Sequence, residues 1–494
     1  MSKVLIIGGG LGGLFCGAIL SKEGLEVTVL EKNATIGGGL QSFRRFGEVF
    51  DTGMHVVGGL QEGGNIRRIC QWLGIWDKVQ VRPIPMECTD LLYVAKEKCY
   101  YQIASGKEGF VASLSKDFPK QHDNLVRYVE AIYRLVDEMD LFYLRPSTRD
   151  IFSHSEEFGM AADGFIAKYI SDEKLRRMLA YLNPLYGGRA DTTPAFIHAT
   201  ISALHINGLN RFAGGSLLFA EALSDSIKAQ GGRVICGDGV QHIHTEGRNI
   251  TGVTTGKGQH FTADHYISAI HPCALLSLLD DPKALPKAYR TRLQEIPSTC
   301  SAFLLYLKLK PETFPYLDYT GYYVQDLEKI WEIGGRGEAF LYMTPPEINQ
   351  GAYSTKMIVA APMSWQEVSR WEDTTVGQRG ADYEEWKQTK AKELLIKLEE
   401  VFPGFRACVE ALNTASPLTI RDYYGTKQGA MFGYAKDWKN MAFSQVPVAT
   451  KIPNLLLTGQ CINLHGFCGV PLTAINTCEA ILGRDSVISK LSNL

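Results

Sequence analysis

The sequence predicts an α/β fold in two parts, one built from segments far apart in the chain and one an α+β domain. Three observations predict it. An apolar run at residues 4–7 leads into a glycine turn, a helical segment and a second apolar run at 27–30. A helix–strand–strand–strand order follows Gly214. Residues 290–420 contain several short strands of different composition, and a length of 494 residues allows two or three lobes.

The first forty residues follow the order strand, glycine turn, helix, strand, acid. Gly8 lets the chain turn out of the strand, Gly10 lets backbone approach a pyrophosphate, and Gly13 lets the helix pack closely on the sheet. The start of the helix offers free N–H groups to phosphates. Glu31 follows Gly8 by about 20 residues, the spacing at which a carboxylate accepts hydrogen bonds from a ribose. This stretch predicts a Rossmann-like dinucleotide site.

Composition narrows the class of protein. A formal net charge of −2 gives no reason to expect a nucleic-acid partner. The eleven cysteines are odd in number and include no C-x-x-C pair, which favours free thiols in a reducing, cytoplasmic setting over disulfides, zinc or a dithiol redox centre. The glycines of the N-terminal run argue against a signal peptide. No window of about 18 uninterrupted apolar residues predicts a membrane span. The apolar stretch at 140–144 is a candidate for peripheral membrane contact, although packed core is the more common use of such a stretch.

The middle of the chain alternates between helical and extended patterns. Glycines at 37–39 and 53 suggest backbone lying against a ligand. We expect a helix over 65–80, a strand pair over 90–103 and a helical cap over 117–182.

After Gly214 we expect a helix over 216–229 and strands at 233–236, 240–243, 250–253 and 262–267, which would continue the first sheet. Further strands at 302–309, 321–324, 339–343 and 356–362, with a helix over 383–401, form the candidate substrate-binding lobe.

The C-terminal region returns to glycine. A strand at 454–460 enters a turn at 466–471, and a helix follows from about residue 472 to 482. This second helix start predicts one extended dinucleotide, with no separate domain for NAD(P). The dinucleotide domain is expected to comprise residues 1–82, 205–290 and 420–494, and the substrate-binding domain, with its mixed or antiparallel sheet and helical cap, residues 83–204 and 291–419.

These motifs resemble a known family. The segment from Gly8 to Glu31, the glycines 37 and 38, the block 214–272 and the terminal Leu-Thr-Gly-Gln at 457–460 look like FAD-dependent oxidoreductases of the phytoene desaturase and amine oxidase superfamily. The segments 50–55 and 457–460 are most similar to the retinol saturase and carotenoid isomerase branch.

The resemblance implies FAD held between the two ends of the chain. It assigns the pyrophosphate to the first glycines, the adenosine ribose to the acid, the adenine to Val240, and the ribityl chain and flavin ring to the C-terminal turn. The implied cofactor-binding residues are Gly8, Gly10, Gly13, Glu31, Lys32, Gly38, Val240, Gly459, Gln460, Gly469 and Val470. Many members carry an arginine directly after the two glycines, whereas this chain has Gly39, so Arg44 or Arg45 would have to substitute or the charge is absent.

The resemblance also implies an activity. A C–C bond of a long apolar substrate, of polyene, isoprenoid or lipid type, would be saturated or desaturated by hydride transfer at flavin N5. The candidate proton donors are His55, His465 and Tyr424, with Lys427 nearby, and each also has a plain structural reading. Cys461 and Cys468 flank His465, but three residues in one loop without a fourth ligand do not predict a metal site.

Three alternatives keep the same fold. An amine oxidase would act on a C–N bond and would need aromatic or acidic walls around a cation, whereas a polyene needs a long aliphatic tunnel. A polyene cis–trans isomerase would use FAD without net redox. A flavoprotein without catalysis would bind FAD and show no turnover. The sequence names neither the electron donor or acceptor nor the substrate.

Overall fold

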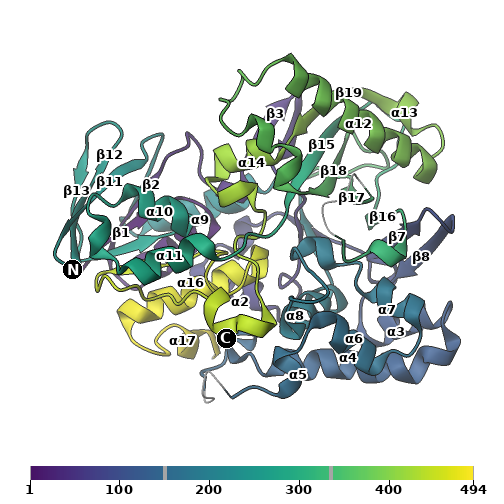
Figure 1. The fold of residues 1–494 in the computed structure, drawn as a ribbon, viewed down its shortest axis with the longest axis horizontal. Coiled ribbons are helices and arrows are strands. Elements are labelled where there is room, and N and C mark those ends of the chain that lie inside the picture. The colour runs from purple at the N-terminus through teal and green to yellow at the C-terminus, as the bar shows by residue number, and fades with distance from the viewer. Residues whose placement is uncertain (1, 148–152, 333–337, 493–494) are drawn as a thin grey trace.

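The computed structural model describes residues 2–147, 153–332 and 338–492. Figure 1 shows two lobes side by side. The first lobe is built on a five-stranded sheet, and the second combines a seven-stranded sheet with a group of helices below it. Elements from both ends of the chain meet in the first lobe (Figure 1). The predicted α/β fold class with an α+β second part is confirmed, while the exact domain boundaries stay a prediction.

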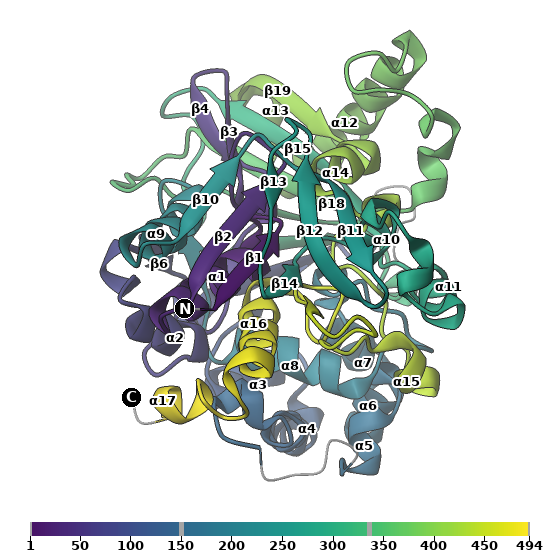
Figure 2. The ribbon, with the colours of Figure 1, turned by 90° about the vertical axis from the view of Figure 1, so that its left-hand side faces the viewer.

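The sheet of the first lobe is fully parallel and draws its strands from three distant parts of the sequence (Figure 2). Its order is β10-β2-β1-β14-β20, with bounds β1 Lys3–Ile7, β2 Glu26–Glu31, β10 Arg233–Cys236, β14 His265–Ser268 and β20 Leu455–Leu457. Alternate residues of β1 enter different cores, Val4 and Ile6 on one face and Leu5 and Ile7 on the other. Both faces of the sheet are therefore covered, as a parallel sheet requires.

Three helices pack together on the Val4 and Ile6 face. They are α1 Leu11–Lys22, α9 Leu217–Ala229 and α16 Gly466–Leu482. The other face carries a three-stranded antiparallel sheet of β11 Val240–Glu246, β12 Asn249–Thr255 and β13 His260–Phe261. The expectation that residues 240–253 continue the first sheet is wrong, because the short connection from β11 to β12 allows only antiparallel pairing.

The sheet of the second lobe is mixed, as predicted. Its order is β19-β15-β18-β17-β16-β7-β8, and every neighbouring pair is antiparallel except β16 with β7. The strands are β7 Asp90–Val94, β8 Cys99–Ile103, β15 Ser301–Leu309, β16 Thr320–Val324, β17 Ala339–Met343, β18 Lys356–Met363 and β19 Val409–Ala415. The helix α12, Ala381–Val401, contributes to the core on one face of this sheet.

A group of helices lies where the cap was predicted over 117–182, but it extends beyond that range on both sides, and residues 148–152 of the range lie outside the described residues. It comprises α3 Lys107–Ser115, α4 His122–Asp137, α5 Glu156–Gly159, α6 Ala162–Tyr169, α7 Glu173–Leu179 and α8 Ala195–Ile206. α8 lies against α4, α5 and α6 and is almost entirely buried. Within the stretch 140–144, Phe142 and Leu144 are buried in the core, so this stretch is not an exposed membrane patch.

Short elements connect the lobes. β5 Val56–Val57 and β6 Val81–Pro83 both pair with β9 Asn210–Phe212, and β3 Ser42–Arg45 pairs with β4 Glu48–Asp51. The helix expected over 65–80 is shorter: α2 spans Asn65–Leu73, because Gly74 ends it with a left-handed conformation. The remaining helices are α10 Pro272–Leu278, α11 Lys287–Glu295, α13 Phe405–Cys408, α14 Pro417–Tyr424, α15 Met441–Ser444 and α17 Ile488–Ser492.

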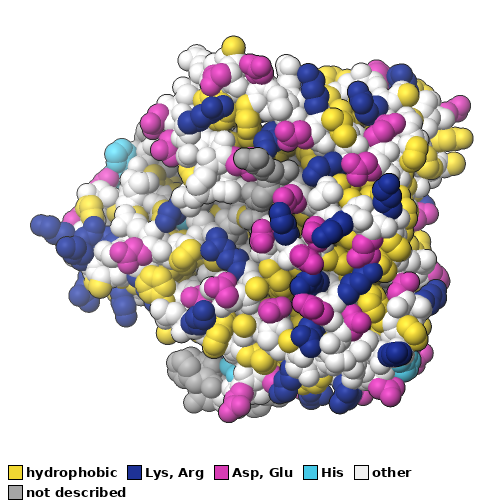
Figure 3. All heavy atoms as spheres, turned by 45° about the vertical axis from the view of Figure 1, so that its right-hand side comes forward, with side chains coloured by type: hydrophobic (Ala, Val, Ile, Leu, Met, Phe, Trp, Pro, Cys, Tyr) yellow, Lys and Arg dark blue, Asp and Glu magenta, His cyan; other side chains and the backbone are white. Residues whose placement is uncertain are grey.

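Two further observations concern the whole molecule. Among the residues that the structure describes, no helix is both long and apolar enough to span a membrane. The face shown in Figure 3 carries acidic and basic side chains mixed over most of its area, in keeping with the net charge of −2.

Candidate active site

A cavity of about 810 Å³ is lined by residues of both lobes. At one end its wall is the glycine turn between β1 and α1, together with Glu31 and Val240. At the other end the wall comes from α8 and from strands of the seven-stranded sheet, with Leu204 and Leu341 among the lining residues. The glycine turn and the aliphatic side chains therefore line one continuous cavity.

The glycine turn has the close packing that its sequence predicts. Gly8 has a φ of +106°, which favours glycine. A Cβ on Gly13 would lie 2.0 Å from the backbone oxygen of Gly8, so this position accepts glycine alone without rearrangement. Gly13 does not itself line the cavity, and its role is to bring α1 against the turn. Gly10 is the N-cap of α1 and carries no side-chain cap, which leaves the first N–H groups of the helix for a ligand.

Glu31 holds the turn and faces the cavity at once. Its Oε2 accepts a hydrogen bond from the backbone N–H of Gly9 at 2.7 Å, and its Oε1 accepts one from Asn33 at 2.8 Å. The side chain is buried and lines the cavity. Each carboxylate oxygen can accept a second hydrogen bond, so capacity is left for a ribose. The neighbouring Lys32 lines the cavity as well, but its ammonium group donates to the carbonyl of Asp422.

An acid that sequence reasoning missed lies beside Val240. Asp238 is buried and lines the cavity next to Gly239. Its carboxylate accepts hydrogen bonds from the hydroxyl of Thr255 and from the backbone of Lys257. These bonds fix the loop that presents Val240 to the cavity. No sequence motif marks Asp238, because its partners Thr255 and Lys257 come only at the end of β12 and just after it.

The C-terminal turn closes the nucleotide end. Gly459, Gln460, Gly469 and Val470 all line the cavity. α16 begins at Gly466, six residues before the expected start at about residue 472. Pro471, expected in the turn before the helix, therefore lies in its interior. Gly469 and Val470 thus lie within the helix. The start of α16 has no side-chain cap, and a Cβ on Gly12 would lie 3.2 Å from Gly459. Two uncapped helix starts side by side, each with a glycine cradle, fit the pyrophosphate and ring of FAD.

Neither arginine takes the place of the arginine expected after the two glycines. Arg44 and Arg45 are exposed on β3 and do not line the cavity. A Cβ on Gly39 would instead lie 3.4 Å from the hydroxyl of Tyr424. That hydroxyl is 3.1 Å from Thr52 Oγ1, and burial raises the pKa of Tyr424. A neutral phenol therefore occupies the space above Gly39.

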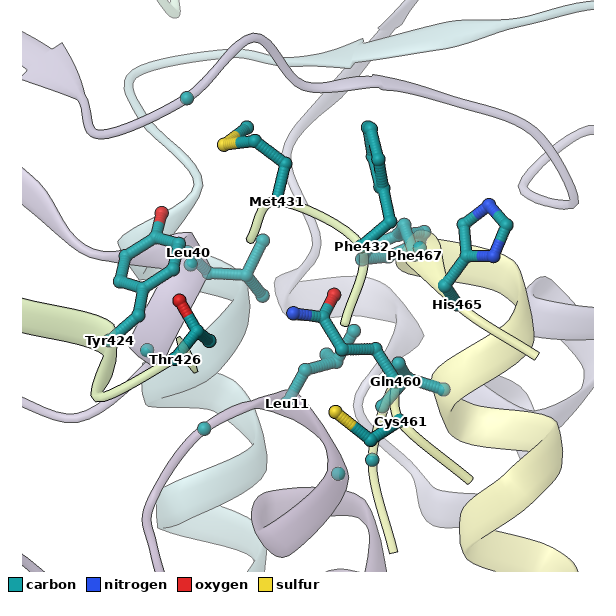
Figure 4. A pocket seen from close by; sticks show the side chains of 18 of the residues that line it. Leu11, Leu40, Tyr424, Thr426, Met431, Phe432, Gln460, Cys461, His465 and Phe467 are labelled. Carbon is teal, nitrogen blue, oxygen red and sulfur yellow. The ribbon is translucent and has the colours of Figure 1, made fainter. Parts of the chain in front are cut away.

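The predicted proton donors lie at different parts of the wall. Figure 4 shows Tyr424 on one side and His465 on the other, with Gln460 and Phe432 between them. His55 lines the cavity too, and its Nδ1 lies 3.4 Å from Asp51 Oδ2. Burial tends to raise the pKa of Asp51, but hydrogen bonds from His55 and other donors outweigh it and leave the pKa lowered. Asp51 is thus a carboxylate that orients His55.

His465 is held neutral. Burial and the nearby charge of Lys436 lower the pKa of His465 to about 4, so its imidazolium form is scarce near neutral pH. Its Nε2 is buried and has no hydrogen-bond partner within residues 2–147, 153–332 and 338–492. Burial also lowers the pKa of Lys436 to about 8, and its ammonium group donates to the carbonyls of Ser444 and Ile462.

The other predicted polar residues have structural roles, and two further histidines line the cavity. Lys427 donates to the carbonyl of Gln294, away from the cavity lining. Cys461 and Cys468 are buried thiols whose pKa values burial raises to about 12. Two histidines that sequence reasoning missed, His205 and His271, line the cavity. Both are separated from the glycine motifs in sequence, and only the fold brings them to the wall.

Comparison with known proteins agrees with this geometry. Residues 11–482 match the model of the family described as flavin containing amine oxidoreductase. The chain is 27% identical over 530 residues to all-trans-retinol 13,14-reductase of Rattus norvegicus, which covers 97% of this chain and 86% of that protein. It is 23% identical over 456 residues to the chloroplastic prolycopene isomerase of Arabidopsis thaliana, which covers 86% of this chain and 73% of that protein.

Solved structures show the same fold. An oxidoreductase from Methanosarcina mazei superposes with a TM-score of 0.66 at 18% identity and covers 97% of this chain and 100% of its own. At this identity the likeness concerns the fold alone. Together with the family match over most of the chain and the cradle between α1 and α16, it leads to one conclusion: the chain belongs to the flavin containing amine oxidoreductase family and is an FAD-dependent oxidoreductase.

Proposed function

We propose that this enzyme saturates or desaturates a C–C bond of a long apolar substrate of polyene or isoprenoid type. The observation that carries the proposal is the aliphatic end of the cavity, which opens directly onto the FAD cradle. Ile197, Ile201 and Leu204 of α8 lie there with Leu304 and Leu341 of the sheet. The similarity to retinol 13,14-reductases and prolycopene isomerases points to the same class of substrate.

The acidic residues of the cavity support this substrate class over an amine. Within the described part of the chain, the carboxylates that line the cavity are Glu31 and Asp238. Both already accept backbone hydrogen bonds at the nucleotide end. Aromatic rings of Phe432 and Phe467 are present, but no carboxylate joins them to balance an ammonium group. A neutral, apolar substrate fits this wall best.

When bound, FAD supplies the redox chemistry, hydride transfer at its N5. The chain's own residues orient the substrate and exclude water. The rings of Phe212 and Phe219 pack edge-on against Phe467 and fix it at the wall. Of the proton-donor candidates, we favour His55, because Asp51 orients its ring and the ring reaches the cavity.

A second candidate function is cis–trans isomerisation of a polyene without net redox. The match to prolycopene isomerases over 86% of the chain favours it. The same cavity and the same FAD cradle would serve both reactions. The two functions differ only in whether electrons are transferred to or from the substrate.

An anaerobic mixing experiment tests the proposal. The holoenzyme is reduced chemically and mixed with a polyene, while the absorbance of flavin and polyene is followed together. Flavin oxidation with loss of polyene conjugation supports a saturase. A change of polyene isomer while the flavin stays reduced supports the isomerase. Reduction of oxidised enzyme by a more saturated polyene supports a desaturase. If only amines reduce the flavin, the C–C proposal is wrong.

The proposal extends to the partners and the location of the enzyme. The electron donor or acceptor is a separate partner that the cavity does not identify. The eleven free cysteines favour a reducing, cytoplasmic location. An apolar substrate dissolved in a bilayer would favour peripheral contact of the enzyme with a membrane.

A further inference from the structure

A buried polar cluster lies behind the aliphatic end of the cavity. It centres on Asp90 at the start of β7 and on His205 in the last turn of α8. Asp90 is 1% exposed, and its Oδ2 lies 2.9 Å from His205 Nδ1 and accepts a hydrogen bond from the hydroxyl of Tyr181 at 2.8 Å. A carboxylate can only accept, so the proton between the two residues belongs to Nδ1. Asp90 thereby fixes the tautomer and the direction of the imidazole ring.

The opposite edge of His205 is left to the cavity. The ring lines the cavity beside Ile201, Leu204 and Leu209. Among the residues that the structure describes, its side-chain hydrogen bonds are confined to Nδ1. Nε2 is therefore a polar atom without a protein partner in an aliphatic wall. Such an atom is costly unless a ligand or water meets it.

A buried arginine, Arg211, is among the groups on which the charge of Asp90 acts. Arg211 is 1% exposed and donates from Nη1 to the carbonyls of Leu317 and Thr344. Burial lowers the pKa of Arg211, and the charge of Asp90 acts against this shift.

A neutral ring with its proton on Nδ1 presents a lone pair at Nε2. We propose that His205 Nε2 accepts a hydrogen bond from a hydroxyl group of the substrate, and that the enzyme prefers long apolar alcohols to hydrocarbons. Asp90 is the positioning residue of this contact. The inference rests on the proposed function, because it assumes that the apolar substrate fills the aliphatic end of the cavity.

Other polar end groups fit less well. A carboxylate would bring its negative charge against the Nε2 lone pair, and Arg211 does not line the cavity to attract it. An ammonium group would lack an anion at this end. A hydroxyl group needs a single acceptor, which His205 supplies.

The test compares two ligands that differ in whether the end oxygen carries a hydrogen or a methyl group. The probes are all-trans-retinol and its methyl ether, with geranylgeraniol and its methyl ether as a second pair. An ether keeps the chain and the oxygen but cannot donate. With holoenzyme, we expect each alcohol to bind about tenfold more tightly than its ether. In His205→Leu the alcohol and the ether should bind alike, and Asp90→Asn should reduce the preference by freeing the tautomer.

A control and the wild-type comparison guard against misfolding. His198 lies on the same helix, buried against Tyr128 and Tyr186 and outside the cavity lining, so His198→Gln should keep the preference for the alcohol. Flavin content reports whether each variant is folded. The comparison of alcohol and ether on the wild-type holoenzyme stands even if no variant folds.

The outcomes separate the two proposals. Equal binding of alcohol and ether by wild-type enzyme, or a preference that survives in His205→Leu, overturns the role of His205 and leaves the proposed function intact. If the holoenzyme binds none of the four probes, the proposed class of apolar substrate is wrong, and both proposals fail.

Discussion

Replacing Glu31 with glutamine tests how far one carboxylate organises the cofactor end. In the structure Glu31 accepts two backbone hydrogen bonds, from Gly9 at 2.7 Å and from Asn33 at 2.8 Å, while it is buried. Hydrogen bonds to a charged group contribute roughly 1.5–3 kcal/mol each. A glutamine at position 31 keeps one oxygen that can accept from the N–H of Gly9 or of Asn33, and its NH₂ group faces the other N–H, which then loses its acceptor. We therefore expect Glu31→Gln to lose about 2–3 kcal/mol of stability even without FAD.

The assay measures two quantities on the same variant. Chemical unfolding of the apoprotein reports the free energy of unfolding, and titration with FAD reports the dissociation constant. Because the ribose loses a charged acceptor, we expect FAD to bind about tenfold more weakly or worse. Glu26→Gln, at the exposed start of the same strand, is the matched control and should change neither quantity. Wild-type stability and wild-type FAD affinity in Glu31→Gln would refute the reasoning.

Three further predictions follow from single contacts. Gly13→Ala should abolish the soluble, flavin-loaded protein, because its Cβ would lie 2.0 Å from the backbone oxygen of Gly8. Gly159→Ala should purify with normal flavin content, because the added carbon would meet nothing within 4 Å beyond its chain neighbours and its own helix backbone. Burial lowers the pKa of Lys436 to about 8 from 10.5, so between pH 8 and 10.5 the unfolded chain binds more protons than the folded one. As the pH increases through this range, the free energy of unfolding of the wild type should therefore rise relative to that of Lys436→Met. A difference in melting temperature that stays constant across this pH range would contradict the prediction. Tyr424→Phe should retain FAD and lose about 1 kcal/mol of stability through the lost contact with Thr52, measured by chemical unfolding, and loss of flavin would give Tyr424 a larger role.

The parts of the fold that could be predicted are those in which neighbours in sequence are neighbours in space. The strand, turn, helix and acid of residues 3–31 form one local unit, so spacing alone predicted that the glycine turn and Glu31 lie side by side. The helix near the C-terminus was also predicted, but its expected start at about residue 472 lies six residues after the observed one, because Pro471 suggested a helix beginning after it.

The parts that could not be predicted depend on contacts between distant segments. Asp90 and His205 are 115 positions apart, and Thr52 and Tyr424 are 372 apart. A histidine inside a helix has no distinguishing pattern, because the same residue commonly serves as a buried hydrogen-bonding group, as His198 does here. The separate sheet of β11 and β12 is a different case, because these strands are neighbours in sequence and the short connection between them already requires antiparallel pairing.

The central claim is that one cavity holds FAD and an apolar substrate in contact. Titrating the oxidised holoenzyme with geranylgeraniol, which does not absorb in the visible range, tests it directly, because any change in the flavin bands then reports the flavin's surroundings. The account predicts saturable displacement of the flavin bands as the ligand replaces water beside the ring. Binding detected by equilibrium dialysis with an unchanged flavin spectrum would place the apolar site elsewhere and contradict the account.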